Sequence, residues 1–530
     1  MSDVDALRRQ LRERGYLTHG IERWFALDPW SSRAFWFELA TVALKAAFLI
    51  AIFAALPFAA VMVFRNYPVR ALETLALYGT YAAAWLAASF ALVVLIALVL
   101  KLRPALPIEG PRALLAISFG ASALLVAPFA IWWFGFDTHP PLSELIVGVV
   151  LTVIFFLVAT IVVSAALLSF SIYELQRVPA IHQKRRGIPM SVAAAALIAL
   201  LFVPAYVTSE PLTFDPMVVT TPTARRVVLI AVDGLTFDIL ESRPELAHAF
   251  GFVKEIAPIS GASTTERWAS LGTGVHTEQH GVRAIEGVRF RGGAHVLQQI
   301  SRSDAVLMSI APRVGIARRE PLPPTVRRRD YIWEIFANRG VPSVAVNWWA
   351  TSDLRDAGLH EVGPESIFAK ANGDALRVDA LATANFLELV DRERPHFATV
   401  YLPALDVILN RQHSDRSTQL AASLRALDGI ANAIALVHAR GYEVVMTGMP
   451  GEGQRGSAVV ASSMPLRITN AWSVAPALLD VLGFPASNEM PGALAMQARI
   501  GSYGPRESSA AATKLNDEYY ENLKSLGYIR

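Results

Sequence analysis

Asp233 is the first residue of this chain whose type and position together suggest chemistry. It follows an unbroken apolar run, VVLIAV, and precedes a glycine. Fully apolar runs of this length are typical of central strands in a parallel sheet. Ligands of open α/β sheets lie beyond the carboxyl ends of the strands. We therefore expect Asp233 to lie at the functional edge of a sheet.

Three further short apolar runs, at 341–346, 397–402 and 443–447, predict the other strands of this sheet. Helical patterns such as RDYIWEIFANRG and STQLAASLRALDGIANAIALVHARG lie between them. Strands and helices in alternation predict an α/β domain with a mostly parallel central sheet.

The N-terminal two-fifths of the chain predict a membrane anchor. The chain is 53% hydrophobic and only 18% charged, whereas soluble proteins carry about a quarter charged residues. Segments that approach the roughly 20 apolar residues of a membrane span lie at 41–64, 75–100, 113–136, 145–172 and 190–207. No acidic residue lies inside them, which favours an anchor over an ion pathway. A groove for a lipid substrate between the helices stays open.

Lysine and arginine in the short loops predict the orientation. They are frequent in the leading segment and in the loops after the second and fourth spans, and rare in the other loops. Because cytoplasmic loops carry the excess of these residues, the N-terminus is expected inside the cell. The predicted domains are a cytoplasmic amphipathic segment at 1–40, five membrane helices at 41–207, a linker at 208–225 and an extracytoplasmic domain at 226–530.

Five segments between residue 226 and the C-terminus carry a family resemblance. They read VVLIAVDGLTFDIL, GASTTERWASLGTGVHTEQHGV, RDYIWEIFANRGVPSVAVNWWAT, ITNAWSVAPALLDVLGFPASNEMPG and LKSLGYI. Their order resembles the type I phosphodiesterase and nucleotide pyrophosphatase branch of the alkaline phosphatase superfamily. Five spans before such a domain also resemble the membrane-bound phosphoethanolamine transferases and lipoteichoic acid synthases of that superfamily.

The resemblance implies a nucleophile and two metal ions. It gives Thr264 the nucleophile position, and Asp233, Thr264 and Asp406 positions of metal ligands. A threonine at a helix N-terminus faces backbone N–H groups that favour phosphate, but its hydroxyl needs a metal to become reactive. The alternative is that Asp233 caps a turn and Thr264 caps a helix.

Most other ligands of the family pattern are absent from this chain. Asn410 stands where the family has a histidine, and Gly448 and Met449 stand where it has an Asp-His pair. Gln454 is the nearest counterpart of the final histidine, and no histidine follows His438. The three remaining positions cannot complete two zinc sites. His413 could rescue the site, and only then would zinc, manganese or magnesium be expected.

Arginines occur at two further places, beside Thr264 and in a separate basic run. Arg267, three residues after Thr264, either contacts an anion or is a solvated helix residue. The basic run that contains Arg318, Arg319 and 327–329 is expected in a solvated loop, with lipid headgroups or an acidic polymer as the alternative partner. The net charge is +3, and much of the positive charge lies in short loops beside apolar runs. No nucleic-acid partner is therefore expected.

The sequence thus supports two hypotheses of function. The first is a degenerate, membrane-anchored, extracytoplasmic phosphodiesterase-like protein, a pseudoenzyme that binds a phosphorylated envelope ligand or scaffolds an envelope protein. The second is an active metal-dependent phosphodiesterase or phosphotransferase with Thr264 as its nucleophile. Whether the chain is an enzyme stays open at this point.

Overall fold

The computed structural model describes most of the chain, in segments separated by gaps, of which 176–222 is the longest. The described residues are 35–66, 69–102, 111–134, 142–175, 223–259, 263–298, 309–356, 358–412, 415–495, 497–506 and 517–529. They form two compact units that are interleaved in sequence. The first comprises Met1–Thr208 and Arg289–Arg318, and the second comprises Ser209–Val288 and Arg319–Arg530.

Four long apolar helices make up most of the first unit. They are α3 (Phe35–Arg65), α4 (Ala71–Leu102), α5 (Pro111–Phe134) and α6 (Leu142–Leu175). They cover the first four predicted spans, and α5 ends slightly before its predicted end. The fifth predicted span at 190–207, the leading segment before residue 35 and most of the linker lie outside the described residues.

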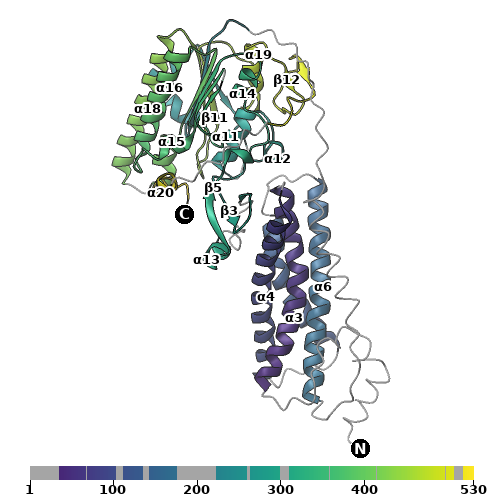
Figure 1. Ribbon diagram of the computed structural model, residues 1–530. Helices are drawn as coiled ribbons and strands as arrows, with labels where there is room; N and C mark the ends of the chain where they lie inside the picture. Colours follow the sequence, from purple (N-terminus) through teal and green to yellow (C-terminus); the bar gives the residue numbers. More distant parts are fainter. Residues whose placement is uncertain are drawn as a thin grey trace, which may run out of the picture. The chain divides into compact units, whose positions relative to one another are not determined.

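Aromatic side chains join these helices in their interior. The ring of Phe58 in α3 lies 5.4 Å from Tyr81 in α4 and 5.2 Å from Phe129 in α5. Phe155 in α6 lies 5.4 Å from Trp85 in α4. Figure 1 shows α3, α4 and α6 alongside one another, which agrees with their packing. The large rings therefore face one another, while many leucine, isoleucine and valine side chains face outward.

By length and composition, α3, α4 and α6 each contain a segment apolar enough to cross a membrane. Helix α5 contains a shorter apolar stretch, Leu115–Ile131. Helix α18 (Arg416–His438) of the second unit is also long and apolar enough. However, α18 packs against α16 (Ala375–Glu393) and the central sheet, so we assign it to the α/β domain.

A three-stranded sheet, with strand order β4-β3-β5, connects to the helices of the first unit. It consists of β3 (Glu286–Phe290), β4 (Leu297–Gln298) and β5 (Ala317–Pro321), and α13 (Ala311–Arg313) precedes β5. The Asn66 side chain accepts from the Gln298 backbone N–H at 2.6 Å. The buried Glu73 carboxylate accepts from the backbone N–H groups of Ala294 and His295 at 2.7 and 2.8 Å. We call residues 289–318 the arm.

The second unit is built on an eight-stranded sheet of order β2-β11-β10-β1-β9-β6-β8-β7. The five central strands are parallel, and β11, β2 and β7 add antiparallel edges. The strands are β1 (Val227–Asp233), β2 (Phe252–Ile256), β6 (Ser343–Val346), β7 (Leu354–Asp356), β8 (Leu359–Val362), β9 (Phe397–Leu402), β10 (Glu443–Met449) and β11 (Ala458–Ser462). The prediction of an α/β domain with a mostly parallel sheet is confirmed.

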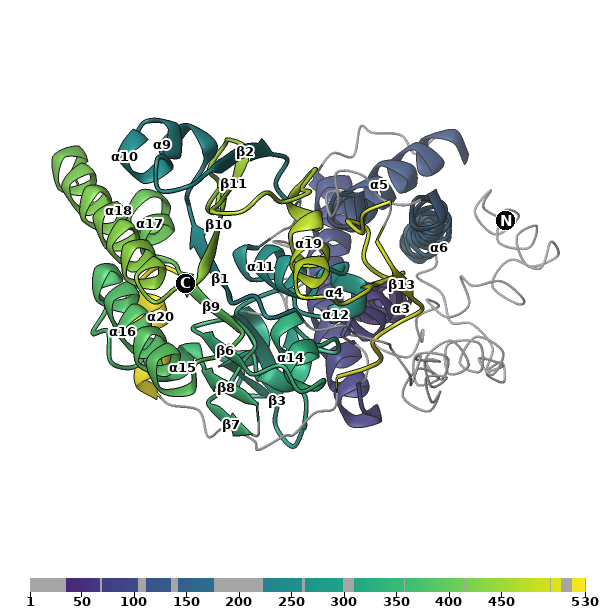
Figure 2. The same ribbon diagram turned by 90° about the horizontal axis from the view of Figure 1, so that it is seen from above.

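Helices cover both faces of this sheet. Figure 2 shows α16 and α18 on one face, and α11 (Thr264–Thr273), α14 (Ile332–Ala337) and α19 (Val474–Val481) on the other. The central strands β1 and β9 are buried along their whole length. The remaining elements are α9 (Phe237–Glu241), α10 (Pro244–Ala247), α12 (Thr277–His280), η2 (Pro324–Val326), α15 (Pro364–Phe368), α17 (Ala404–Asp406), η3 (Val407–Arg411), η4 (Ala471–Ser473), β12 (Ala486–Ser487), β13 (Arg499–Ile500) and α20 (Asp517–Ser525).

Candidate functional site

The predicted site residues meet at the carboxyl edge of the sheet. Asp233 is the last residue of β1, and Asp406 lies in α17, directly after the neighbouring strand β9. Thr264 opens α11, whose preceding Ser263 caps the helix by accepting from the Glu266 N–H at 3.1 Å. All three predicted ligand residues are almost completely buried. The prediction that Thr264 lies at the start of a helix agrees with the structure.

Arg411 joins two of these residues. Its Nε donates to Asp406 Oδ2 at 2.6 Å, and its Nη2 donates to Thr264 Oγ1 at 3.1 Å. Its Nη1 lies 2.8 Å from a carboxylate oxygen of Glu452. Only 4% of the Arg411 side chain is exposed. A guanidinium group thus links a predicted ligand to the predicted nucleophile and uses all three of its nitrogens in doing so.

The turn η3 explains how Arg411 reaches the site. It is a wider, π-type helical turn, a feature that often occurs at functional sites. Within this turn both Asn410 and Arg411 reach the Asp406 carboxylate. Asn410 Nδ2 donates to Asp406 Oδ1 at 2.9 Å. From the sequence, Asn410 was singled out only because it stands where the family pattern has a histidine, and Arg411 was not singled out.

Thr264 receives a second guanidinium hydrogen bond, from Arg267. Arg267 Nη2 donates to Thr264 Oγ1 at 3.2 Å, and Arg267 Nη1 donates to the Pro450 carbonyl at 2.7 Å. A hydroxyl oxygen has two acceptor lone pairs. Arg267 and Arg411 engage both, so neither lone pair is left for a metal ion or for attack on phosphorus in this arrangement. Of the two interpretations of Arg267, the solvated helix residue does not fit these contacts.

The loop after β10 closes over Asp406. The Glu452 N–H donates to Asp406 Oδ1 at 3.0 Å. Gln454 Oε1 accepts from the Gly451 N–H at 2.8 Å and from Asn410 Nδ2 at 3.3 Å. A Cβ atom on Gly451 would lie 1.9 Å from Asp406 Oδ1, so only glycine allows this approach. Backbone and amide groups therefore fill the places that the family pattern gives to histidine and aspartate.

Asp233 is held differently. Its Oδ2 accepts from the Tyr401 hydroxyl at 2.8 Å, whereas its buried Oδ1 has no hydrogen-bond partner among the described residues. Burial and the negative charge of Asp406 raise the pKa of Asp233 to about 7, although Arg267 and Arg411 partly oppose this shift. A substantial fraction of Asp233 is therefore protonated at neutral pH.

Tyr528, close to the C-terminus, completes the wall of the site. The Arg411 guanidinium lies over its ring, 4.1 Å from the centroid, a distance that allows a cation–π interaction. The ring of Trp349 lies 5.3 Å from that of Tyr528 and 5.9 Å from that of Tyr401. Sequence reasoning missed Arg411, Tyr401 and Tyr528. The only signal for Tyr528 was its place in the LKSLGYI segment.

The side chains present do not fit a two-metal centre. Thr264 has both lone pairs engaged, and both Asp406 oxygens accept hydrogen bonds from Arg411, Asn410 and the Glu452 N–H. Within the described part of the chain, no group of three or more His, Asp or Glu side chains could hold a metal ion. His413, the predicted rescue ligand, lies outside the described residues.

The histidine of the HG turn has a structural role. His280 is fully buried, its Nδ1 accepts from the Val282 N–H at 3.0 Å, and its Nε2 lies 2.9 Å from the Ser270 hydroxyl. Burial and the nearby arginines hold the pKa of His280 well below its usual value, so the ring is neutral. Both ring nitrogens are thus used, one by the Val282 N–H of the turn and one by Ser270 of α11.

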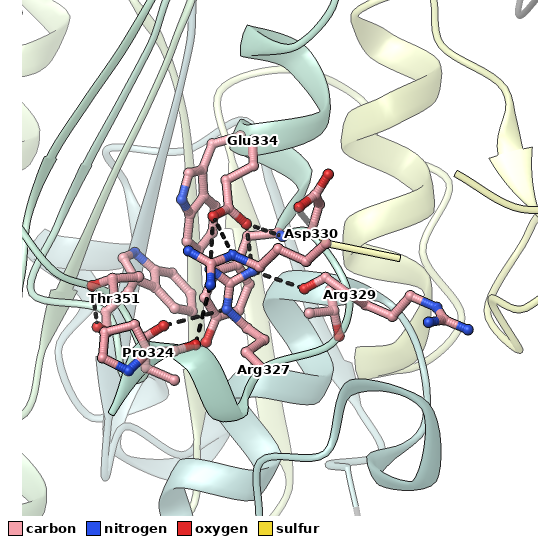
Figure 3. Close-up of polar contacts among 12 residues, drawn as sticks. Pro324, Arg327, Arg329, Asp330, Glu334 and Thr351 are labelled. Carbon is pink, nitrogen blue, oxygen red and sulfur yellow. Dashed lines mark hydrogen bonds and ion pairs between the residues drawn. The ribbon is translucent and has the colours of Figure 1, made fainter. Parts of the chain in front are cut away.

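The interpretation of 327–329 as a solvated basic loop was wrong. The Arg327 side chain is fully buried, forms two hydrogen bonds to the Glu334 carboxylate, and lies over the Tyr331 ring (Figure 3). Arg329 Nη2 donates to Glu489 at 2.7 Å. Arg506 Nε joins the same Glu334 carboxylate at 3.1 Å. Arg506 therefore links the C-terminal part of the domain to α14, and Arg327 and Arg329 form ion pairs within the domain rather than with lipid headgroups.

Comparison with known protein families identifies a match over this domain. Residues 227–448 match the sequence model of the family described as type I phosphodiesterase / nucleotide pyrophosphatase. This range contains Asp233, Thr264, Asp406 and Arg411, whereas Gly451, Gln454 and Tyr528 follow it. A comparison with curated protein sequences found no match.

Solved structures resemble parts of the chain at low identity. Phosphonoacetate hydrolase from Sinorhizobium meliloti 1021 is 14% identical over 46% of this chain and 60% of its own length, with a TM-score of 0.32. Murine ectonucleotide pyrophosphatase / phosphodiesterase 5 is 13% identical over 42% of this chain and 56% of its own length, with a TM-score of 0.31.

The lipoteichoic acid synthase LtaP from Listeria monocytogenes is 8% identical over 52% of this chain and 78% of its own length, with a TM-score of 0.30. Similarities of this size carry no argument about activity or substrate, because a fold does not bring its chemistry with it. The match over residues 227–448 identifies the part of the chain that holds the candidate site as related to the type I phosphodiesterases and nucleotide pyrophosphatases, as the motifs predicted.

Proposed function

We propose that this chain is a membrane-anchored, non-catalytic scaffolding protein of the cell envelope, in which the inherited phosphodiesterase centre has become structural. One observation carries the proposal. The Arg411 guanidinium bridges Asp406 and Thr264, and a built-in cation there replaces the positive charge that metal ions supply in a two-metal site. A phosphorylated ligand at this centre is the less favoured role, because both arginines already bind protein groups.

Membrane anchoring with an extracytoplasmic α/β domain is part of this proposal. The Lys and Arg residues of the leading segment and of the loops after the second and fourth spans support a cytoplasmic N-terminus. Five crossings would then bring everything after residue 207 to the outside.

The contacts of the arm support an odd number of crossings. Asn66 and Glu73, on either side of the connection between α3 and α4, bind the backbone at residues 294–298. If α3 crosses the membrane, this connection and the arm lie on the side opposite the N-terminus. Helices α3 to α6 make four crossings, so this arrangement requires a further one before residue 289. The fifth predicted span, at 190–207, would supply it.

A second candidate function, the metal-dependent phosphodiesterase or phosphotransferase, is favoured by one observation. The buried Asp233 Oδ1 lacks a hydrogen-bond partner among the described residues, and an unsatisfied carboxylate oxygen can take a cation as well as a proton. For this function Arg411 would have to leave Thr264, which would release a lone pair of the nucleophile.

Metal content and phosphodiester cleavage, measured on the full-length protein in detergent, distinguish the two functions. After dialysis we expect no stoichiometric zinc, manganese or magnesium, and no cleavage of a chromogenic phosphodiester when these ions are added. Stoichiometric metal, together with cleavage that Thr264→Ala abolishes, would instead establish the enzyme. Thr265→Ala is the matched control, because Thr265 is equally buried and its hydroxyl has no hydrogen-bond partner among the described residues.

A further inference from the structure

The tip of the arm exposes three apolar side chains within seven residues. Ile310, Val314 and Ile316 are 42%, 63% and 42% exposed. Single exposed apolar residues are ordinary on protein surfaces, but a group of them on one short turn marks a contact surface. We call residues 310–316 the tip.

The tip adjoins the beginning of α4. The Ile316 carbonyl accepts from the Arg291 N–H at 3.0 Å, which places the tip beside residues 291–293. At Gly292 a Cβ atom would lie 3.7 Å from the Leu72 side chain, and at Gly293 it would lie 3.0 Å from a Glu73 carboxylate oxygen. Leu72 and Glu73 belong to the first turn of α4, so the tip is only a few residues from that helix end.

Under the proposed membrane anchoring, this end of α4 is where the chain enters the membrane. The apolar segment of α4 begins at Ala71, and the outward-facing Leu72 and Leu75 are 56% and 53% exposed. An apolar side chain held beside such a helix end lies at the depth of the lipid headgroups, where amphipathic segments bury their apolar face.

Basic residues flank the apolar side chains. Arg291 and Arg313 are exposed, Arg313 lies two residues before Gly315, and a Cβ atom at Gly315 would lie 3.6 Å from Arg291 Nη2. Arginines around an apolar tip are the arrangement that favours an anionic membrane surface, since their guanidinium groups can reach lipid phosphates while the apolar residues enter the interface.

We propose that the tip inserts into the lipid headgroup layer beside α4 and is a second contact of the protein with its membrane. This inference rests on the membrane anchoring in the proposed function and is independent of whether the Thr264 centre is catalytic. The same contact would form whichever side of the membrane the arm occupies. Charge and position favour lipid over a protein partner as the occupant.

The absence of cysteine from the chain gives a direct test. Single cysteines at Val314 and, separately, at Leu420 are labelled with an environment-sensitive fluorophore in the full-length protein. The protein is then reconstituted into vesicles of phosphatidylcholine and phosphatidylglycerol. Leu420 is the matched control, because this apolar residue is 61% exposed and lies on α18 of the other unit.

We expect the label at residue 314 to emit at shorter wavelength, to be quenched by a lipid carrying a nitroxide high on its acyl chain, and to be protected from iodide in the buffer. The label at residue 420 should show the opposite for all three. Equal iodide quenching of both labels would overturn the proposal. Protection from iodide without quenching by the nitroxide lipid would also overturn it and would indicate a protein contact. Ile316→Cys repeats the measurement if labelling at residue 314 disturbs the protein.

Discussion

Beside Thr264, the Arg411 guanidinium forms ion pairs with the carboxylates of Asp406 and Glu452. Asp406 is fully buried and Arg411 is nearly so, and their shortest contact is 2.6 Å. Breaking a buried ion pair from one side is strongly destabilising, because the remaining charge stays buried without compensation. This centre therefore contributes to the stability of the domain whatever its role in chemistry.

Arg411→Ala should destabilise the α/β domain by about 3–5 kcal/mol, because Asp406 then loses its buried cation. A lower midpoint of denaturant-induced unfolding, followed by tryptophan fluorescence in detergent, would show this. Arg440→Ala is the control, since Arg440 forms its ion pair with the exposed Asp391. Removal of such a surface pair has a small effect. Equal shifts for both variants would contradict a special role for Arg411.

Asp233 should make the stability of the domain depend on pH. Its pKa is raised from the usual value of about 4 to about 7, so the folded state binds the proton more tightly than the unfolded state. The resulting stabilisation is complete below the unfolded pKa and is lost as the pH rises through the folded pKa.

Asp233→Asn should remove this dependence, because the amide is neutral and its oxygen still accepts from the Tyr401 hydroxyl. Thermal unfolding between about pH 4 and pH 8 would compare the two proteins. We expect the asparagine variant to gain stability relative to the native protein as the pH rises. Parallel pH profiles would show that Asp233 does not carry the raised pKa.

At this scale, the sequence pattern predicted Asp233 at the end of a strand and Thr264 at the start of a helix, and both lie there. Arg411 was missed because its role depends on a π-type turn, which a helical period of 3.6 residues does not predict. Arg327 was misplaced because three consecutive arginines next to prolines suggest a solvated loop. In the structure Arg327 is buried by its ion pair with Glu334.

At the scale of elements, the strands were predictable because their apolar runs are short, β-branched and separated by helical patterns. The 397–402 prediction coincides with β9, and the 443–447 prediction falls within β10. The antiparallel strands β2, β11 and β7 were not predicted. β2 and β7 are edge strands with exposed polar residues, and β11 is a short buried segment between β2 and β10. The arm was also unforeseen, because its contacts join residues more than 200 positions apart.

The loop after β10 depends on a glycine at residue 451. Gly451→Ala should force this loop away from Asp406, because the new Cβ would overlap the carboxylate, and overpacking of this kind costs about 1–3 kcal/mol. The midpoint of thermal unfolding would report the loss. Gly429→Ala in α18 is the control, since no atom lies within 4 Å of its Cβ position and alanine favours helices. A loss of stability in the control alone would refute this view of the loop.

At the scale of the whole molecule, orientation is the property to test first. A cysteine at Leu420 should react with a membrane-impermeant maleimide in intact cells. A cysteine at Ser2 should react only after the membrane is opened, because we propose that the N-terminus is cytoplasmic. Reaction of both, or of Ser2 alone, in intact cells would contradict the proposed five crossings.

The interleaving of the two units has a consequence for biosynthesis. Residues 289–318 belong with the helices of the first unit, although the first 80 residues of the second unit, 209–288, precede them in the chain. A ribosome therefore delivers all the helices α3 to α6 long before it delivers the strand that Asn66 and Glu73 bind. Until then, Glu73 is a carboxylate in an apolar helix without its backbone donors from the arm. Asn66 and Glu73 thus gain these partners only after the arm has been synthesised, and a fragment that begins after the linker would carry the arm without the helices that it binds.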